Sequence, residues 1–242
     1  MKGIYYDLHV HSCLSPCADD DMTPNNIVNM AMLAGLNAVA LTDHNSCKNC
    51  AAAAAAATEA GIIFIPGMEL ETAEAIHVVC LFPTVEAAQK FSEAVYDYLP
   101  PITNRPDIYG NQIICDADDS EIGREERLLV NSTSIGIYEV PELCDRFGGV
   151  SVLAHIDRHS NGVLGVLGDV SEDMGFALAE TSPLGDADDY KVRFPFLSFI
   201  GDSDAHRLWE IQEPAERCFL EGDFSSAEDI IRFFKSMQKK YQ

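Results

Sequence analysis

Residues 4–11 have the sequence IYYDLHVH, which predicts a strand over Ile4–Val10 that ends in two histidines. Alternate residues of a strand point to the same face, about 6.6 Å apart along it. His9 and His11 can therefore offer two imidazole nitrogens to one ion. We take this strand as the start of the fold and of a candidate metal site.

A regular alternation of strand and helix continues from this first strand. Thr23-Pro24 is a favourable helix start, and Asn25–Ala34 has helical periodicity up to Gly35. Further strands are expected at Ala38–Thr42, Ile62–Ile65, Ile76–Phe82, Val150–His155, Phe176–Glu180, Leu197–Gly201 and Arg217–Leu220. Further helices are expected over Ala51–Ala57, Val85–Tyr98, Val140–Phe147 and Ser226–Met237. Such alternation predicts a parallel sheet, and about seven units favour an α/β barrel, with a doubly wound open sheet as the alternative.

One segment interrupts the alternation. From Pro100 to about Thr133 the sequence predicts a hairpin or small excursion, with strand residues at Ile113–Cys115 and a turn at Asp118-Asp119. With no internal repeat, we expect a single barrel domain over residues 1–242 that carries an excursion around residues 100–135.

The composition restricts the classes of partner. The net charge is −23, which would repel a nucleic-acid backbone over any extended contact. A small phosphorylated substrate remains compatible, because clustered divalent cations reverse the local field. No apolar run approaches the roughly 18–20 residues that span a bilayer, and the N-terminal residues lack a signal-peptide pattern. We therefore expect a soluble, cytoplasmic protein without membrane contact.

Six of the seven histidines lie at or beside predicted strands, and His159 lies in a loop. The six are His9, His11, His44, His77, His155 and His206. A single histidine beside a strand is usually a hydrogen-bonded structural residue, but clustered imidazoles require a cation between them. Asp204 and His206 repeat the spacing of the first pair, and the first and last strands of a closed barrel are neighbours. The two pairs are expected to converge.

Glu69 is a carboxylate in the apolar sequence Gly67-Met68-Glu69-Leu70, just past a predicted strand. Burial of an unpaired carboxylate is costly, and a position between two cations would remove that cost. The alternative is a solvent-facing glutamate in an acidic chain, with Glu71 and Glu74 nearby.

Together these residues resemble the polymerase and histidinol phosphatase (PHP) family of metal-dependent phosphoesterases. The matching segments are Asp7–Ser12, Thr42–Asn45, Gly67–Glu69, His77, Ala154-His155 and Gly201–His206. The resemblance implies a distorted (β/α)7 TIM-like barrel with two or three divalent Zn, Mn or Fe ions.

The resemblance also implies the ligands of each ion. His9, His11, Glu69 and Asp204 would hold the first ion, and Glu69 would bridge to a second ion held by His77 and His155. A third site would use His44, His206 and one early residue. This chain departs from the family pattern at that early residue, because a short insertion precedes it. Asp19 is selected by counting back from Thr23, with Asp20 and Cys17 as alternatives.

The implied chemistry is hydrolysis of a phosphate ester, with Asp204 and Glu69 as catalytic residues and Asp204 also handling the proton of the attacking water. Arg158, three residues past His155, is the candidate for binding substrate phosphate, and Lys48 and Arg207 also lie near predicted ligands. The alternative for each basic residue is a solvent-exposed partner of nearby acids.

Four cysteines near the first two strands leave a further possibility open. Cys13, Cys17, Cys47 and Cys50 would form a four-cysteine zinc or iron–sulfur site if they met. Structural or simply reduced thiols are the alternative.

The leading hypothesis is thus a phosphatase or phosphodiesterase that acts on a small phosphorylated substrate, nucleotides included. Two alternatives remain: a 3′–5′ exonuclease acting on nucleic acid, and a non-catalytic, metal-binding regulatory protein. The oligomeric state is left open.

Overall fold

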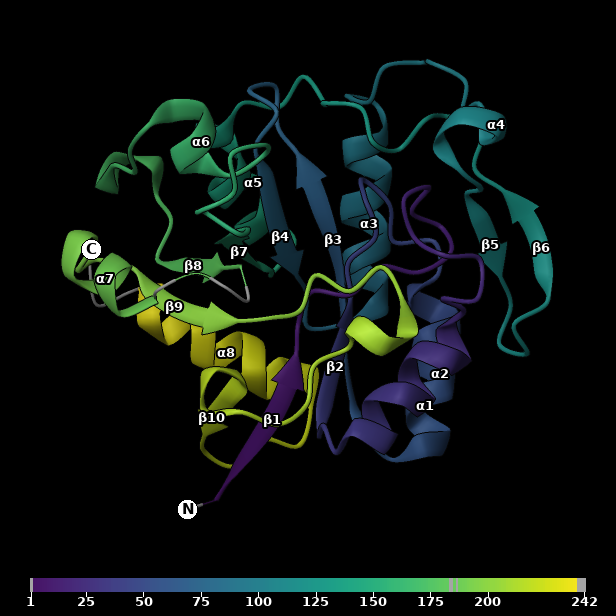
Figure 1. Ribbon diagram of the computed structural model, residues 1–242, viewed down its shortest axis with the longest axis horizontal. Coiled ribbons are helices and arrows are strands. Elements are labelled where there is room, and N and C mark those ends of the chain that lie inside the picture. Colours follow the sequence, from purple (N-terminus) through teal and green to yellow (C-terminus); the bar gives the residue numbers. More distant parts are fainter. Residues whose placement is uncertain (1, 183–184, 186, 239–242) are drawn as a thin grey trace.

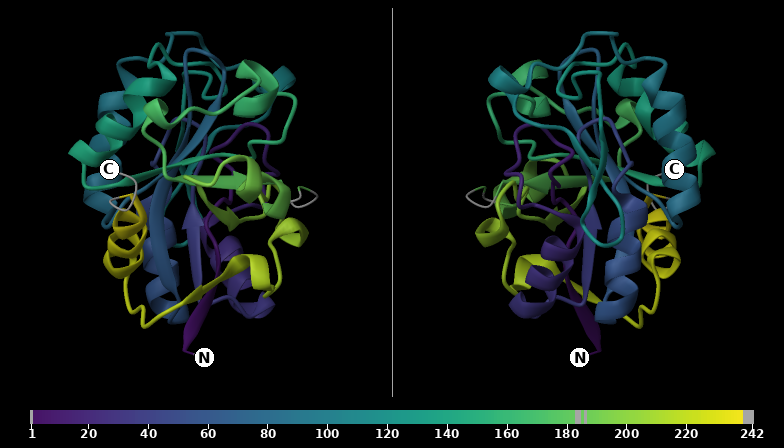
Figure 2. Two further views of the ribbon diagram at one scale, coloured as in Figure 1. Left: turned by 90° about the vertical axis from the view of Figure 1, so that its left-hand side faces the viewer. Right: turned by 90° about the vertical axis from the view of Figure 1, so that its right-hand side faces the viewer.

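In the computed structural model, which describes residues 2–182, 185 and 187–238, eight strands form one sheet (Figures 1 and 2). Its order is β10-β1-β2-β3-β4-β7-β8-β9. These strands are β1 (Gly3–Asp7), β2 (Ala38–Leu41), β3 (Ile63–Glu71), β4 (His77–Leu81), β7 (Val150–Leu153), β8 (Leu178–Thr181), β9 (Ser198–Gly201) and β10 (Phe219–Glu221). Each strand predicted for the main sheet is present close to its expected bounds, except that β3 runs on to Glu71 where the prediction ended at Ile65.

The sheet is mixed, so the prediction of a parallel sheet was wrong in two places. β1, β2 and β3 are parallel to one another, as are β7, β8 and β9. β4 is antiparallel to both β3 and β7, and β10 is antiparallel to β1. Only the turn Thr72–Ile76 joins β3 to β4, which is too short for a parallel crossover but long enough for a hairpin.

The sheet curls, so that the exit of its last parallel strand meets the end of the first. Val10 and Ala205 form a parallel bridge, and the backbone N–H of His11 donates to the Ala205 carbonyl at 2.9 Å. This curled, half-barrel sheet confirms the distorted TIM-like barrel and not the open doubly wound sheet.

Helices pack on both faces of the sheet (Figure 1). The predicted helices are α1 (Pro24–Ala34), α2 (Cys50–Ala60), α3 (Val85–Tyr96), α5 (Val140–Arg146) and α8 (Ala227–Gln238). Short helices that the sequence did not predict are α4 (Pro106–Tyr109), α6 (Val163–Leu167) and α7 (Ala187–Arg193). α1 begins at Pro24 and ends at Gly35, whose φ of 93° is the left-handed cap that glycine adopts readily.

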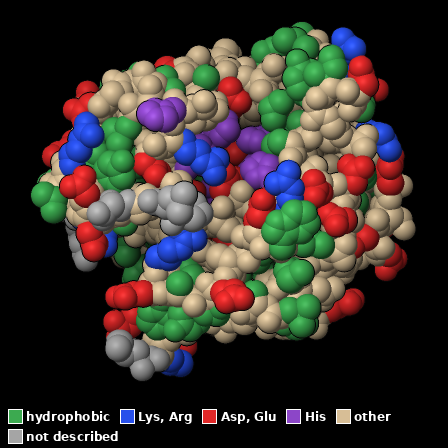
Figure 3. Space-filling model, viewed as in Figure 1, with side chains coloured by type: hydrophobic (Ala, Val, Ile, Leu, Met, Phe, Trp, Pro, Cys, Tyr) green, Lys and Arg blue, Asp and Glu red, His purple; other side chains and the backbone are tan. Residues whose placement is uncertain are grey.

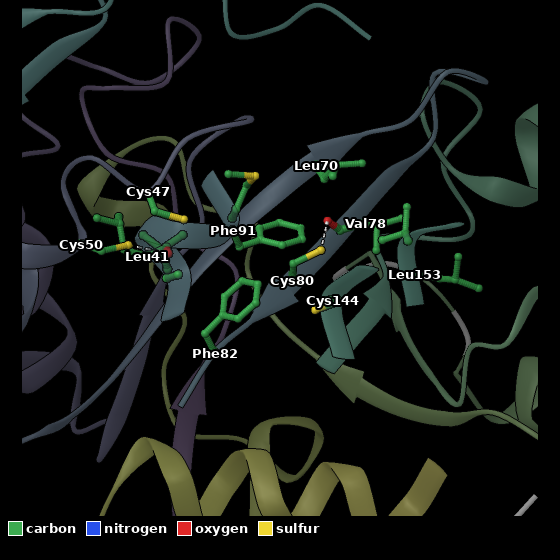
Figure 4. Close-up of a cluster of buried hydrophobic side chains, with 14 of the residues drawn as sticks. Leu41, Cys47, Cys50, Leu70, Val78, Cys80, Phe82, Phe91, Cys144 and Leu153 are labelled. Carbon is green, nitrogen blue, oxygen red and sulfur yellow. Dashed lines mark hydrogen bonds between the residues drawn. The ribbon is translucent and has the colours of Figure 1, made fainter. Parts of the chain in front are cut away.

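Two buried apolar clusters hold the layers together. On one face, α8 packs on alternate residues of the strands through Ile230 and Phe234. On the other face, α1, α2, α3 and α5 share a core in which the rings of Phe82 and Phe91 lie 4.8 Å apart (Figure 4). Cys47 and Cys50 belong to this second core.

The four cysteines near the first two strands do not meet. Cys47 donates its thiol to the Gly67 carbonyl at 3.1 Å inside the core, and Cys17 is exposed. Cys13 lies 3.5 Å from Cys115, measured between the sulfur atoms. In the described part of the chain no group of potential metal ligands contains a cysteine. The geometry therefore favours reduced, mostly buried thiols.

The predicted excursion forms a separate hairpin of β5 (Ile113–Cys115) and β6 (Glu121–Arg124) at one side of the molecule (Figures 1 and 2). Its anchor is the loop after β1, because the backbone N–H of Ile113 donates to the Cys13 carbonyl at 2.8 Å. Asn49 donates to the Ile113 carbonyl at 3.1 Å and accepts from the Cys115 N–H at 2.9 Å.

Over the described residues, no helix is long and apolar enough to cross a membrane.

Candidate metal centre

All of the predicted ligands except Asp19 gather at one edge of the curled sheet. His9 and His11 follow β1, His155 follows β7, and Asp204 and His206 follow β9. His44 follows β2 and forms a parallel bridge with Glu69, which lies within β3 and not past its end as expected. In Figure 3 histidine side chains line a hollow in the surface that Lys or Arg side chains border.

The carboxylate of Glu69 is the centre of this group. Glu69 is 1% exposed, so the alternative of a solvent-facing glutamate is wrong. Five histidines place a ring nitrogen close to its oxygens: His9 at 3.2 Å, His11 at 3.3 Å, His44 at 3.0 Å, His77 at 2.9 Å and His155 at 3.2 Å. Such crowding around a buried carboxylate is the arrangement expected where a divalent cation is held.

Asp204, which lies far from His9 and His11 in the sequence, also belongs to this group. Its Oδ1 lies 3.3 Å from Nε2 of His9 and 3.1 Å from Nε2 of His11. The ring of His206 stacks on that of His11 with centroids 4.2 Å apart. The first and last motifs thus converge as predicted, because the Val10–Ala205 bridge joins the segments that follow β1 and β9.

Three backbone positions at this edge are strained. Asn45, His155 and Asp204 have φ angles of 47°, 27° and 55°, in the left-handed region that non-glycine residues rarely occupy. Each such residue costs about 1–3 kcal/mol and persists where the surrounding structure enforces it. Strain at two predicted ligands indicates that the fold is organised around their side chains.

Three sets of ligand atoms, each within 4.8 Å of one another, could hold a metal ion. They are His9, His11, Glu69 and Asp204; His44, Glu69 and His77; and His11, His44 and His206. The first set is the predicted first site. The second contains His44 where the prediction had His155, although Nε2 of His155 also lies 3.2 Å from Glu69.

The donors present fit a bound cation. Nδ1 of His44 and Oδ1 of Asp204 are buried beside other candidate ligands, yet neither makes a hydrogen bond of acceptable geometry. Buried polar atoms are rarely left unpaired, because losing water without a replacement partner costs about 1–3 kcal/mol. Coordination to a cation would satisfy lone pairs of this kind. The mixed nitrogen and oxygen donors, without thiolates, suit Zn, Mn or Fe.

The charges of the group depend strongly on one another. Burial lowers the pKa of His9, but nearby carboxylates, Glu180 foremost, hold it well above its ordinary value. Burial likewise opposes the charge of His77, and Glu69 raises that pKa to about 10. Burial raises the pKa of Asp204 and of Glu69, yet the histidines bring both well below their usual range, chiefly His9 for Asp204 and His77 for Glu69. The carboxylates therefore stay ionised and attract positive charge.

A second layer of residues orients the histidines, and the sequence analysis missed it. Glu180, buried at the end of β8, accepts a hydrogen bond from Nδ1 of His9 at 2.9 Å, which turns Nε2 toward Glu69. Ser15 lies 2.9 Å from Nδ1 of His11 and donates to Asp43 at 2.7 Å. The available signal for Glu180 was a carboxylate ending the apolar strand Phe176–Glu180.

The structure does not bring Asp19 to the group. Its side chain is 43% exposed, and its carboxylate lies 3.6 Å from Nε of Arg207. Of the alternatives, Asp20 accepts from Asn111 at 2.8 Å, and Cys17 is exposed. In the third set of ligand atoms the early residue is His11 instead.

Arg158 lies at the mouth of the group, as predicted. Its Nη1 is 2.6 Å from Oδ2 of Asp204. A cleft of about 330 Å³ opens there, lined by His77, His155, Arg158, His159, Ser160 and Asn161. A guanidinium beside the candidate metal ligands suits an anionic group such as phosphate.

A curled α/β sheet with a histidine and carboxylate cluster at its strand ends is the arrangement of a metal-dependent hydrolase fold. The family model of the PHP domain matches residues 7–181, and the chain belongs to the PHP family.

Known proteins similar to this chain include nucleases. Over 79 residues the chain is 39% identical to a Haemophilus influenzae protein described as a 5′-3′ exoribonuclease, with 31% of this chain and 28% of that protein covered. The lesion-specific endonuclease PfuEndoQ of Pyrococcus furiosus superposes with a TM-score of 0.60 at 20% identity, covering 86% of this chain and 49% of that one. The chain thus spans about half of the endonuclease and less of the exoribonuclease.

A candidate metal-dependent phosphoesterase from Bifidobacterium adolescentis matches over nearly the full length of both chains. Its TM-score is 0.60 at 17% identity, with 96% of each chain covered. At such identities both structural matches bear on the fold alone.

Proposed function

We propose that this chain is a metal-dependent hydrolase of phosphoesters that acts on a small phosphorylated substrate. One observation carries the proposal: Asp204 lies between the ligand nitrogens of His9 and His11 and the guanidinium of Arg158. That arrangement puts a candidate metal site and an anion-binding group on opposite sides of one carboxylate.

In this proposal His9, His11, Glu69 and Asp204 hold one ion, and Glu69 is shared with a second site. The second site draws on the histidines that surround the same carboxylate, namely His44, His77 and His155, and His206 completes a third. Bound divalent ions would polarise the phosphate oxygens and lower the pKa of an attacking water.

The protein side chains supply the rest of the chemistry. Arg158 binds a phosphate oxygen and keeps the substrate beside Asp204. Asp204 has a pKa well below its usual range, so its carboxylate is ionised at neutral pH and can accept a hydrogen bond from the water. Glu180 orients His9 through its hydrogen bond to Nδ1.

Hydrolysis at the end of a nucleic acid is the second candidate. Its support is the identity over 79 residues with a protein described as an exoribonuclease. The net charge of −23 opposes a long strand footprint but leaves room for a terminal nucleotide. The exoribonuclease is described as acting 5′-3′, opposite to the 3′–5′ direction of the exonuclease alternative. A non-catalytic role is disfavoured because the set of candidate ligands is nearly complete.

The test is a panel of phosphoesters offered to protein loaded with Mn, Zn or Fe, with single-stranded RNA and DNA included at physiological salt. We expect hydrolysis of small substrates that is lost in Asp204→Ala and kept in Asp223→Ala, an exposed aspartate paired with Lys2. Normal rates in Asp204→Ala would refute the assignment. Faster cleavage of strands than of small esters would favour the second candidate, and no cleavage at all would favour the non-catalytic role.

A further inference from the structure

Trp209, the only tryptophan of the chain, is 71% exposed and lies three residues after His206. It belongs to the short turn Leu208–Glu210, in which Leu208 packs against the core, and Ile211 just after the turn lies in the core. The turn therefore directs the indole outward. Three residues span at most about 10 Å, so the backbone of Trp209 lies within about 10 Å of the backbone of His206.

Hydrogen bonds hold this turn in a fixed position relative to the candidate metal centre. Glu210 accepts the backbone N–H of His206 at 2.9 Å with one oxygen and Nη1 of Arg207 at 3.0 Å with the other. Cζ of Arg207 lies 5.8 Å from the centre of the Trp209 ring. We name Arg207 and Trp209 the indole platform.

We propose that the indole platform binds the base of a nucleotide whose phosphate lies at the metal centre. This inference rests on the proposed function and adds the substrate class to it. Bases stack on exposed indole and guanidinium groups whatever their sequence, and one stacked base contributes about 1–3 kcal/mol. A sugar phosphate without a base has no flat ring to offer.

The distribution of charge limits how much of a nucleic acid the platform can engage. Asp19 lies 3.6 Å from Nε of Arg207, and Glu210 pairs with the same guanidinium, so the platform is held between two acids. These acids leave the neutral face of a base unaffected but repel a run of phosphates. A single base, either free in a mononucleotide or at the end of a strand, matches the platform.

Tryptophan fluorescence tests the inference directly, because Trp209 is the sole emitter of its kind in the chain. Metal-loaded protein is mixed with adenosine 5′-monophosphate or ribose 5-phosphate, which differ only in the base. We expect adenosine 5′-monophosphate to quench the Trp209 fluorescence saturably and ribose 5-phosphate not to quench it. The fluorescence is measured immediately after mixing. Equal responses to both compounds, or no response to either, would overturn the inference. Triadenylate that binds more tightly than the mononucleotide would identify a strand end as the source of the base.

Kinetics give a second measurement. The ratio of KM for ribose 5-phosphate to KM for adenosine 5′-monophosphate should fall about ten-fold or more in Trp209→Ala. Trp209→Phe should restore most of the ratio, and Tyr138→Ala, an exposed aromatic in another turn, should leave it as in the wild type. An unchanged ratio in Trp209→Ala overturns the inference even if phosphoesters are hydrolysed. If no ester is hydrolysed, the proposed function fails, and the quenching still decides whether the platform binds a base.

Discussion

Replacement of Glu180 by glutamine tests how far the centre depends on residues that touch no metal. The carboxylate of Glu180 is 1% exposed and lies 2.9 and 3.2 Å from Nδ1 of His9. Glutamine keeps an acceptor oxygen at about the same place and removes the charge. His9 would keep its position but lose the group that contributes most to its basicity.

The size of the effect follows from this contact. A hydrogen bond to a charged group contributes about 1.5–3 kcal/mol, against about 1 kcal/mol for a neutral pair. The difference of about 1–2 kcal/mol corresponds to roughly a 5- to 30-fold loss of affinity for an ion held by His9 in the proposed centre. Losses of this order are typical when the partner of a metal-bound histidine is changed.

The assay is a competition titration of the metal-free protein with Zn or Mn against a chromophoric chelator. Glu142→Gln, in an exposed glutamate of α5, is the matched control and should bind as the wild type does. Circular dichroism of both variants establishes that they are folded. Affinity within two-fold of the wild type in folded Glu180→Gln would refute the idea that Glu180 supports the centre through His9.

Four further outcomes are expected. Because Glu69 raises the pKa of His77 to about 10, metal binding should release protons and strengthen as pH rises from 6.5 toward 10; calorimetry in buffers of different ionisation enthalpy measures this. In the metal-free protein the raised pKa of His77 stabilises the fold below pH 6.5, and this stabilisation is lost as the pH rises toward 10. The lowered pKa of Glu69 stabilises the fold above about pH 4.5, and this stabilisation is lost in acid. Urea unfolding should therefore show greatest stability at about pH 5–6, and a maximum outside that window contradicts this account. Arg158→Ala should lower kcat/KM about ten-fold or more, from loss of a charge-assisted contact, while Arg193→Ala should not. Phe91→Ala should cost about 3–5 kcal/mol of unfolding free energy because the ring is fully buried, and a loss under 1 kcal/mol would contradict the packing described.

The sequence predicted the presence of the strands better than their lengths. The strand ending at Ile65 was expected to stop before Pro66 and Gly67, since both residues commonly interrupt strands. Instead β3 continues to Glu71, and Gly67 is required there because a Cβ would meet the Cys80 carbonyl of β4 at 2.9 Å. Gly67 is thus the residue that lets β3 and β4 approach closely.

The candidate site was predictable where side chains recur at strand ends and not where they come from loops. His9, His11 and Asp204 follow from spacing alone, since a closed sheet brings its first and last strands together. The position of Asp19 was inferred by counting along an insertion, and the loop places it beside Arg207 instead. Glu180 gave no spacing signal because its partner, His9, is far away in sequence.

The closure of the sheet between Val10 and Ala205 also governs when the centre can exist during synthesis. A nascent chain that has emerged as far as residue 200 carries His9, His11 and Glu69 but has no Asp204, so the first set of ligands is one donor short. Contacts between such distant segments form late, because a long loop must close before they stabilise anything. Metal binding at the first set of ligands should therefore mark the completion of folding.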